Sequence, residues 1–311
     1  MTSSPKNIAA SVRQRLLNIA REAKEEFQFV LTRYALERLL FRLSQSPHGS
    51  RFVLKGAMLF RVWTGVIHRP TKDLDLLGYG ENSPKQMASI FQDVCRIVVI
   101  DDGLKFIAET VTAELIKDGD EYEGVRVHFN ATLDNARIPL QVDIGFGDAI
   151  TPAAVEAEFP TLLEFPAPRV MAYPQPTVIA EKFQAMVALG IANSRMKDFF
   201  DVWTLARQFE FDGSLLARAI AATFERRRTA IPQAVPLALT AEFATDRTKA
   251  TQWRAFLNRS KLAPQNPDFG EVIELLRTFL IPPTEALASG SDFPAHWPPA
   301  GPWQLDALRR S

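Results

Sequence analysis

The chain of 311 residues carries 36 Lys and Arg residues against 36 Asp and Glu residues, so its formal net charge at pH 7 is zero. This balance excludes a global attraction to nucleic acid or to an anionic membrane, and any RNA contact would need a local basic patch. The single cysteine, Cys95, excludes an intrachain disulfide framework and a cysteine-based zinc site.

The distribution of apolar residues indicates the compartment. No apolar run approaches the roughly 18–20 residues of a membrane span. The first residues, Met1 to Lys6, lead into a charged helix and lack the apolar core of a secretory signal. We therefore expect a cytoplasmic protein without membrane contacts.

Residues 1–50 predict a helical segment that packs on the following core. Apolar residues recur at helical spacing from Val12 to Ala20 and again from Val30 to Leu43, and Ser46-Pro47-His48-Gly49-Ser50 breaks the pattern. We expect the basic residues of this segment to lie on solvated helix faces, namely Arg13, Arg15, Arg33 and Arg38.

Residues 51–150 predict an α/β core. Phe52–Trp63 has the pattern of a short buried strand, a turn at Lys55-Gly56 and a helix. A glycine at a strand-to-helix turn lets backbone N–H groups approach a phosphate. The sequence therefore predicts a phosphate-binding turn near the start of this core.

Asp73 and Asp75 stand two residues apart in a predicted strand, with Leu74 and Leu76 between and after them. In a strand, residues i and i+2 share a face, so both carboxylates point one way while the leucines point into the core. Two such carboxylates repel each other unless a cation lies between them, and Mg²⁺ commonly uses one or two carboxylates plus substrate phosphates. An isolated Asp-x-Asp can also be a solvated strand entry.

The segment Ile138–Ile144 alternates so that Asp143 and Gln141 face away from four apolar residues. Asp143 thus offers a third carboxylate on another strand. Before it, Ser83 is placed to cap a helix, and residues 111–116 and 124–133 predict a hairpin. We expect Asp101 and Asp102 in a surface turn. The pattern predicts a small mixed sheet with a helix layer, in the α+β class.

Residues 151–311 predict a mainly helical domain that ends in a proline-rich tail. After a connecting stretch with many prolines, Thr177 is a plausible N-cap of a helix in which Lys182 falls inside the apolar arc. Such a lysine must snorkel, form a pair or bind a ligand. On the next helix Asp198 and Asp201 share a face, so we expect a pair between Lys182 and Asp198.

Two further features of this domain carry predictions. Arg226-Arg227-Arg228 lies at a helix end, where it can compensate the helix dipole or contact RNA phosphates. The tail contains Trp297 and Trp303, which we expect to pack onto the body of the domain.

A glycine turn, then Asp-x-Asp on the next strand, then a lone Asp on a later strand is the layout of the DNA polymerase β-like nucleotidyltransferases. From about Val12 to the C-terminus, the sequence resembles the AbiEii/AbiGii-type (MenT-like) nucleotidyltransferase toxins. The segments that carry this resemblance are FVLKGAMLF, RPTKDLDLLG, QVDIGFGD, IAEKFQAM and KDFFDVW. No single motif is specific, whereas their order and spacing together are.

The resemblance implies a fold, an activity and partners. It implies a metal-dependent nucleotidyltransferase (EC 2.7.7 type) and the toxin of a toxin–antitoxin or phage-defence system. Members add nucleotides from a nucleoside triphosphate (NTP) to the 3′ acceptor end of tRNA and so block translation, and a cognate antitoxin protein is expected.

The resemblance also assigns site residues. The catalytic set is Asp73, Asp75, Lys182 and Asp198, with Asp201 as the alternative for the last. We expect Asp73, Asp75 and Asp143 to hold Mg²⁺ or Mn²⁺. The expected nucleotide-binding residues are Lys55, Gly56, Ala57, Arg69 and Thr71.

One departure from the pattern supports a different function. Polymerase β-like enzymes usually carry Gly-Ser at the turn, where the hydroxyl contacts the triphosphate, and this chain has Gly56-Ala57. Thr64 or Thr71 are candidates to replace that hydroxyl. The alternative is a catalytically inactive module on the same fold that binds a nucleotide or a protein.

Overall fold

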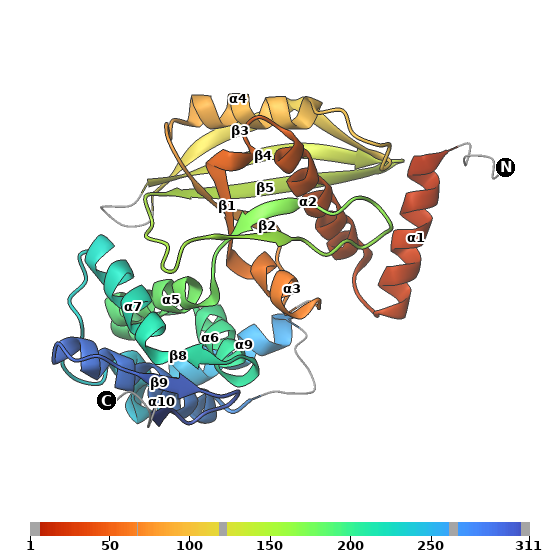
Figure 1. Cartoon of the computed structure of the whole chain (residues 1–311). Coiled ribbons are helices and arrows are strands. Elements are labelled where there is room, and N and C mark those ends of the chain that lie inside the picture. Colours follow the sequence, from red (N-terminus) through yellow and green to blue (C-terminus); the bar gives the residue numbers. More distant parts are fainter. Residues whose placement is uncertain (1–6, 67, 118–122, 261–266, 306–311) are drawn as a thin grey trace. The chain divides into compact units, whose positions relative to one another are not determined.

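The computed structural model describes residues 7–66, 68–117, 123–260 and 267–305 (Figure 1). The predicted character of the first six residues therefore lies outside the described part. The chain divides into two compact units. The first is Met1–Gly147 with Val155–Ala172, and the second is Asp148–Ala154 with Tyr173–Ser311.

The described strands of the first unit form one mixed sheet with the order β3-β4-β5-β2-β1-β7-β6. β2 pairs in parallel with β5, β1 pairs in parallel with β7, and the other neighbours are antiparallel. The strands are β1 (Phe52–Lys55), β2 (Asp73–Gly78), β3 (Leu104–Lys117), β4 (Glu123–Leu133), β5 (Ala136–Phe146), β6 (Val155–Glu158) and β7 (Arg169–Ala172).

Helices pack on this sheet: α4 contacts β3 and β4, and α2 contacts β5, β7 and α4. Ser83 caps α4 by accepting a hydrogen bond from the Gln86 N–H, with Pro84 at the first position, as predicted. The helices of this unit are α1 (Ile8–Glu22), α2 (Phe27–Gln45), α3 (Leu59–Thr64) and α4 (Pro84–Arg96), with short 3₁₀ turns η1 (Gly49–Arg51) and η2 (Gly56–Met58). The α+β class is therefore confirmed.

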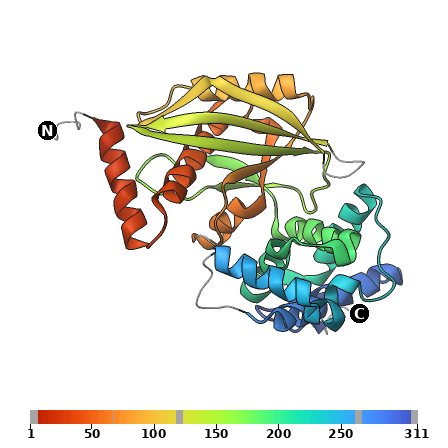
Figure 2. The ribbon, with the colours of Figure 1, turned by 180° about the vertical axis from the view of Figure 1, so that it is seen from behind.

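The core lies between these helices and one face of the sheet. On β4, Val127 and Phe129 are at most 2% exposed, and on β5 Val142 and Ile144 are at most 1% exposed. Arg126, His128, Gln141 and Asp143 alternate with them and are partly exposed. The period of two therefore gives the long strands, seen from behind in Figure 2, one apolar face and one polar face.

The surface positions predicted for Asp102 and Arg38 are wrong, because both side chains are at most 1% exposed. Arg42 donates to both Asp102 oxygens at 2.7 and 3.0 Å, and Arg38 Nε donates to Oδ2 at 3.1 Å. A buried carboxylate must be paired. Two arginines of α2 supply the pairs and join this helix to the turn before β3.

Glu37 is a third buried acid on α2, with 0% exposure. It accepts a hydrogen bond from the Leu162 N–H at 2.7 Å. Burial raises the pKa of Glu37 to about 7, although the Leu162 N–H and nearby arginines, Arg61 first among them, oppose the rise. Glu37 therefore links α2 to the segment between β6 and β7 through this hydrogen bond.

The second unit is mainly helical. α5 packs against α7, and α6 and α7 pack against α10. The described elements are α5 (Gln175–Leu189), η3 (Gly190–Ala192), α6 (Met196–Gln208), β8 (Phe211–Asp212), α7 (Gly213–Arg226), η4 (Leu237–Leu239), α8 (Ala241–Thr245), α9 (Arg247–Ser260), α10 (Phe269–Ala288), β9 (Ala295–Trp297) and β10 (Gln304–Leu305). The strands form a small sheet with the order β10-β9-β8.

The tail packs on this unit as predicted. Trp297 is 0% exposed and donates to the Ala206 carbonyl at 2.7 Å. Trp303 donates to the Phe279 carbonyl at 2.9 Å and stacks on the Phe279 ring. The indole N–H groups thus find backbone partners while the rings fill the core.

The predicted N-cap at Thr177 is wrong, because α5 begins at Gln175 and its N-cap is Pro174. Pro176 fits the first turn, where its missing N–H costs nothing, so the helix starts earlier than Thr177. The Thr177 hydroxyl instead donates to the Thr151 carbonyl and accepts from the Thr151 N–H. Among the described helices, none is long and apolar enough to cross a membrane.

Candidate active site

Three carboxylates of the first unit meet on the polar face of the sheet. The parallel pairing of β2 with β5 places Asp75 opposite Asp143 and Asp73 opposite Gln141. Asp73, Asp75 and Asp143 each offer an oxygen, and these three oxygens lie within 4.8 Å of one another. Leu74 and Leu76 point to the other face and are at most 1% exposed. We call these three residues the carboxylate triad.

The donor set of the carboxylate triad fits a hard divalent cation. Three carboxylates so close together repel one another, and a bound cation relieves the repulsion. Mg²⁺ and Mn²⁺ prefer oxygen ligands, and all three ligands here are carboxylate oxygens. The carboxylate triad can therefore hold a metal ion.

Gly56 lies directly beneath the Asp75 carboxylate. A Cβ atom at Gly56 would stand 2.0 Å from Asp75 Oδ2, and the residue has φ of +75°. Both facts require glycine at this turn. Lys55 stands opposite Asp75 in the register of β1 and β2, and Ala57 is 8% exposed. The predicted turn and the carboxylate triad are thus adjacent.

Arg126 on β4 forms a bidentate hydrogen-bonded pair with Asp143. The sequence analysis did not identify Arg126 as a residue of the site. Its Nε donates to Oδ1 at 2.8 Å and its Nη2 donates to Oδ2 at 2.7 Å. The hydrogen bond with Asp143 raises the pKa of Arg126 above its ordinary value. The alternation of β4 placed Arg126 on the open face, but the sequence did not give the register that sets it opposite Asp143.

The threonines considered as substitutes for the missing serine differ in their contacts. The Thr71 hydroxyl donates to Asp73 Oδ1 at 2.5 Å, so it lies beside the carboxylate triad. The Thr64 hydroxyl donates to the Phe60 carbonyl at 2.7 Å within its own helix. Arg69 is half-buried in the segment before β2. Of the two threonines, Thr71 is the one positioned to serve the site.

The second unit contains a buried cluster around Lys182. Lys182 Nζ lies 2.6 Å from Asp198 Oδ1 and 2.8 Å from Asp201 Oδ2. Both aspartates are 0% exposed, and the lysine side chain is 12% exposed. The predicted contact between Lys182 and Asp198 is present, and Asp201 joins it. We call Lys182, Asp198 and Asp201 the lysine cluster.

Arg195 completes the charge balance of the lysine cluster, and the sequence analysis did not single it out. Its Nε lies 2.7 Å from Asp198 Oδ2, and Arg195 is the N-cap residue of α6, three positions before Asp198. Burial alone would raise the pKa of Asp198, but Lys182 and Arg195 outweigh it and hold that pKa below its ordinary value. The spacing of Arg195 and Asp198 was a signal that could have identified this pair.

Arg227, the central residue of the arginine run at the end of α7, forms contacts within the second unit. Arg227 Nη2 lies 3.1 Å from Asp148 Oδ1, and Nη1 donates to Gln184 Oε1 at 3.0 Å. Arg227 is therefore tied to α5 and to the segment that begins the second unit. These contacts make internal pairing the role of Arg227.

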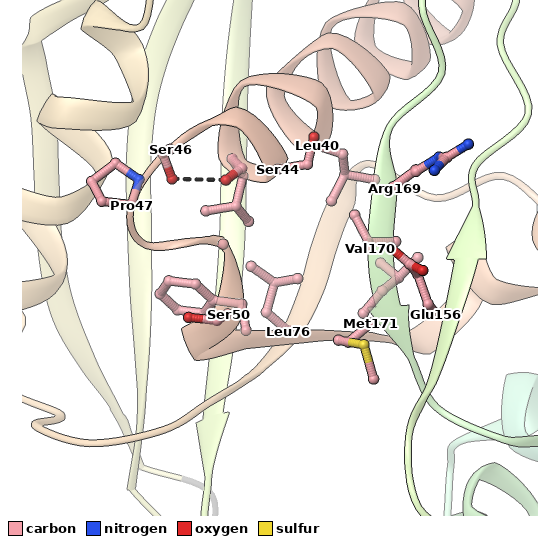
Figure 3. Close-up of a pocket in the computed structure, with 14 residues that line it drawn as sticks. Leu40, Ser44, Ser46, Pro47, Ser50, Leu76, Glu156, Arg169, Val170 and Met171 are labelled. Atoms are coloured by element: carbon pink, nitrogen blue, oxygen red, sulfur yellow. Dashed lines mark hydrogen bonds between the residues drawn. The ribbon is translucent and has the colours of Figure 1, made fainter.

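The predicted site residues therefore fall into two sets, one in each unit. A separate cavity in the first unit, drawn in Figure 3, has a volume of about 280 Å³. Leu76 lines it and alternates with Asp75 along β2, so the cavity lies on the sheet face opposite the carboxylate triad. Leu54 and Leu76 line it together with residues of α2 and β7. None of the predicted site residues is among the described residues that line this cavity. Its walls mix apolar side chains with polar and charged ones, among them Ser44, Glu156 and Arg169.

One comparison with known proteins identifies the family of the chain. A family model described as "Nucleotidyl transferase AbiEii toxin, Type IV TA system" matches residues 38–275. This span is well over half of the chain. The fold and the carboxylate triad thus belong to a nucleotidyltransferase. The chain is a member of the AbiEii nucleotidyltransferase toxin family.

Two solved structures from Helicobacter pylori match the chain at low similarity. JHP933 has a TM-score of 0.48 and 14% identity over 85% of this chain and 98% of that chain. A "putative nucleotidyltransferase from H. pylori" has a TM-score of 0.46 and 15% identity over 85% of this chain and 94% of that chain. Both similarities are too remote to bear on the site chemistry. None of the curated proteins matches the chain.

Proposed function

We propose that this toxin transfers nucleotides from an NTP to the 3′ end of tRNA in a reaction that depends on Mg²⁺ or Mn²⁺, and that the modified tRNA no longer supports translation. The carboxylate triad on β2 and β5 carries this proposal, because its three oxygens lie within 4.8 Å beside the Gly56 turn. A metal ion held by such a set can stabilise the charge that develops in phosphoryl-type transfer.

The residues of the first unit would divide the work as follows. Asp73, Asp75 and Asp143 would hold the metal ion, which supplies charge stabilisation to the transferring phosphate when bound. The backbone at Gly56 and Ala57 would bind the triphosphate, together with Lys55, Arg69 and Thr71. The acceptor hydroxyl would attack the α-phosphorus and release its proton to water. The bond between the α-phosphorus and the oxygen that bridges it to the β-phosphorus would break, and pyrophosphate would leave.

The lysine cluster would supply the remaining catalytic groups. Lys182 would act as a point cation toward phosphate, and Asp198 and Asp201 would hold its ammonium group in place. The partly exposed Lys182 side chain and the fully buried aspartates fit this division. We propose accordingly that residues 51–150 contribute the transferase core, residues 1–50 support it, and residues 151–311 contribute the second set of charged groups.

Membership of a toxin family supports further partners. A cognate antitoxin would limit the activity in the cytoplasm, in a system of the MenT-like or phage-defence kind. The alternative, an inactive module that binds a nucleotide or a protein, is favoured by one observation. Ala57 offers no hydroxyl at the position where related enzymes place serine.

Nucleotide incorporation distinguishes these functions. The purified chain would be incubated with total tRNA and each labelled NTP in turn, with Mg²⁺, with Mn²⁺ or with a chelator. We expect incorporation that requires the metal, that is lost when the tRNA 3′ ends are oxidised with periodate, and that Asp75→Asn abolishes. Binding of nucleotide without any incorporation would establish the binding module instead. Incorporation that survives periodate oxidation would exclude the 3′ hydroxyl as the acceptor.

A further inference from the structure

Both carboxylate oxygens of Asp143 are already held by donors of the first unit. Arg126 donates to Oδ1 at 2.8 Å and to Oδ2 at 2.7 Å. The Gln141 amide lies 3.1 and 3.2 Å from the same two oxygens. A carboxylate offers about four lone-pair positions. These four contacts therefore occupy the acceptor capacity of Asp143.

The contact with Arg126 is strong and well placed. Charge-assisted, two-pronged arginine–carboxylate contacts are among the strongest hydrogen-bonded pairs in proteins. The Asp143 side chain is 18% exposed and that of Arg126 is 35% exposed, so water screens the pair incompletely. Arg126 and Asp143 also face each other in the register of β4 and β5, which fixes the contact.

We propose that Arg126 competes with the divalent cation for Asp143, so that the guanidinium neutralises this carboxylate when no ion is present and must give up at least one of its oxygens when the ion binds. This inference rests on the proposed function, since it takes the carboxylate triad as the metal site. An ion ligated by Asp143 needs a lone pair that now accepts from a donor. Breaking that contact lowers the apparent affinity for the ion. Arg126 is thus a positioning residue that acts through Asp143.

Direct titration with Mn²⁺ alone tests the competition. Free Mn²⁺ would be followed by electron paramagnetic resonance as it is added to the full chain, to Arg126→Gln and to Arg126→Lys. We expect Arg126→Gln to tighten the Mn²⁺ dissociation constant about tenfold. Arg126→Lys keeps the positive charge but cannot form the bidentate hydrogen bonds of the guanidinium group. We therefore expect a smaller decrease of the Mn²⁺ dissociation constant, about threefold.

Arg137→Gln is the matched control, because Arg137 lies on the same strand as Asp143 and its Nε donates to Asn130 rather than to the carboxylate triad. It removes the same charge and should leave Mn²⁺ affinity unchanged. Equal tightening by Arg126→Gln and Arg137→Gln would reduce the effect to net charge and overturn the inference. Unchanged or weaker binding by both Arg126 variants would also overturn it.

The wild type and Asp75→Asn separate this inference from the proposed function. If the wild type binds Mn²⁺ and Asp75→Asn does not, the metal site stands, and the Arg126 variants alone decide the competition. If the wild type and Asp75→Asn bind Mn²⁺ equally, the carboxylate triad is not the metal site and both proposals fail. Circular dichroism of each variant checks that the sheet is retained.

Discussion

The carboxylate triad and the lysine cluster both bring acidic side chains close together, but they differ in burial and in how the negative charge is balanced. The carboxylate triad lies half-buried on an open sheet face, where two neighbouring strands bring three acids within 4.8 Å. The lysine cluster lies in a helical core, where both acids are 0% exposed and Lys182 contacts each of them. The first arrangement is half-buried and pairs Asp143 with Arg126 at its edge, whereas the second encloses its lysine between two fully buried acids.

This difference teaches what each set of residues contributes to stability. Water still reaches the carboxylate triad, because all three acids are only half-buried, so neutralising Asp75 by mutation should remove little from the stability of the folded state. The lysine cluster is desolvated, and its acids depend on the ammonium group for their charge to be tolerated. The same chemical change should therefore affect function at one location and folding at the other.

Replacing Lys182 with methionine should have the largest effect on stability. The change keeps the side-chain volume but leaves Asp198 and Asp201 buried without the ammonium group, and breaking a buried pair costs about 3–5 kcal/mol. Denaturant unfolding at neutral pH measures the loss. Arg195→Gln is the control, because Arg195 is 42% exposed and should cost less than about 1 kcal/mol. Equal stability of Lys182→Met and the wild type would refute desolvation of the cluster.

The pH dependence of the same two proteins sharpens the comparison. The pKa of Asp198 is lowered in the folded chain, so its contribution to stability is present above the unfolded pKa and is lost as the pH falls through the folded pKa. Without Lys182 this lowering should largely disappear. The stability difference between wild type and Lys182→Met should therefore shrink in acid, and a constant difference would contradict the assignment.

Replacing Asp75 with asparagine should separate activity from stability. The amide has nearly the volume of the carboxylate, and the side chain is only half-buried, so the free energy of unfolding should change by about 0.5 kcal/mol or less. Loss of one metal ligand should lower the transfer rate about a hundredfold or more, since each 1.4 kcal/mol is tenfold. Growth arrest and tRNA labelling would be scored together. A folded variant with full activity would refute the metal-binding role of Asp75.

Replacing Glu37 with glutamine tests a buried acid outside both sets, and its effect should be confined to the upper part of the pH range. The pKa of Glu37 is raised from 4.5 to about 7, so the folded state binds the proton more tightly than the unfolded state and stability falls as the pH rises through this window. Glutamine keeps an acceptor for the Leu162 N–H but does not ionise. We expect similar stability near pH 5 and an advantage of about 2 kcal/mol for Glu37→Gln near pH 8.

Thermal unfolding of both proteins across this range provides the measurement. Glu164→Gln is a suitable control, because Glu164 lies in the same segment as Leu162 but its side chain is exposed. It should shift the curve equally at every pH of the window. An advantage of Glu37→Gln that does not grow with pH would contradict the raised pKa of Glu37.

Much of the fold was predictable from local patterns. The period of two in β2 and β5 predicted the faces of Asp75 and Asp143, and the apolar arc of α5 predicted a partner for Lys182. These patterns work because one face of each element is buried. They specify which way a side chain points. The start of a helix was also predictable where a local residue marks it, as the cap Ser83 and the turn residue Gly56 do.

Contacts that depend on strand register or on tertiary burial were not predictable. Arg126 meets Asp143 because β4 pairs with β5 in one particular register, and nothing local fixes that register. Arg38 and Asp102 can be buried because Asp102 pairs with both Arg38 and Arg42, although composition alone favours the surface for both. In each case the missing information lies in a partner distant in sequence.

The interrupted course of the chain has a consequence for its synthesis. The first unit is not finished when β5 ends, because β7, the parallel partner of β1, comes only after Asp148–Ala154 of the second unit. A ribosome must therefore synthesise part of the second unit before the first unit is complete. Until β7 (Arg169–Ala172) has been made, β1 is paired with β2 on one side and lacks its parallel partner on the other. A nascent chain therefore completes this sheet only when Ala172 has been made, a little past the middle of the 311 residues, rather than when β5 ends.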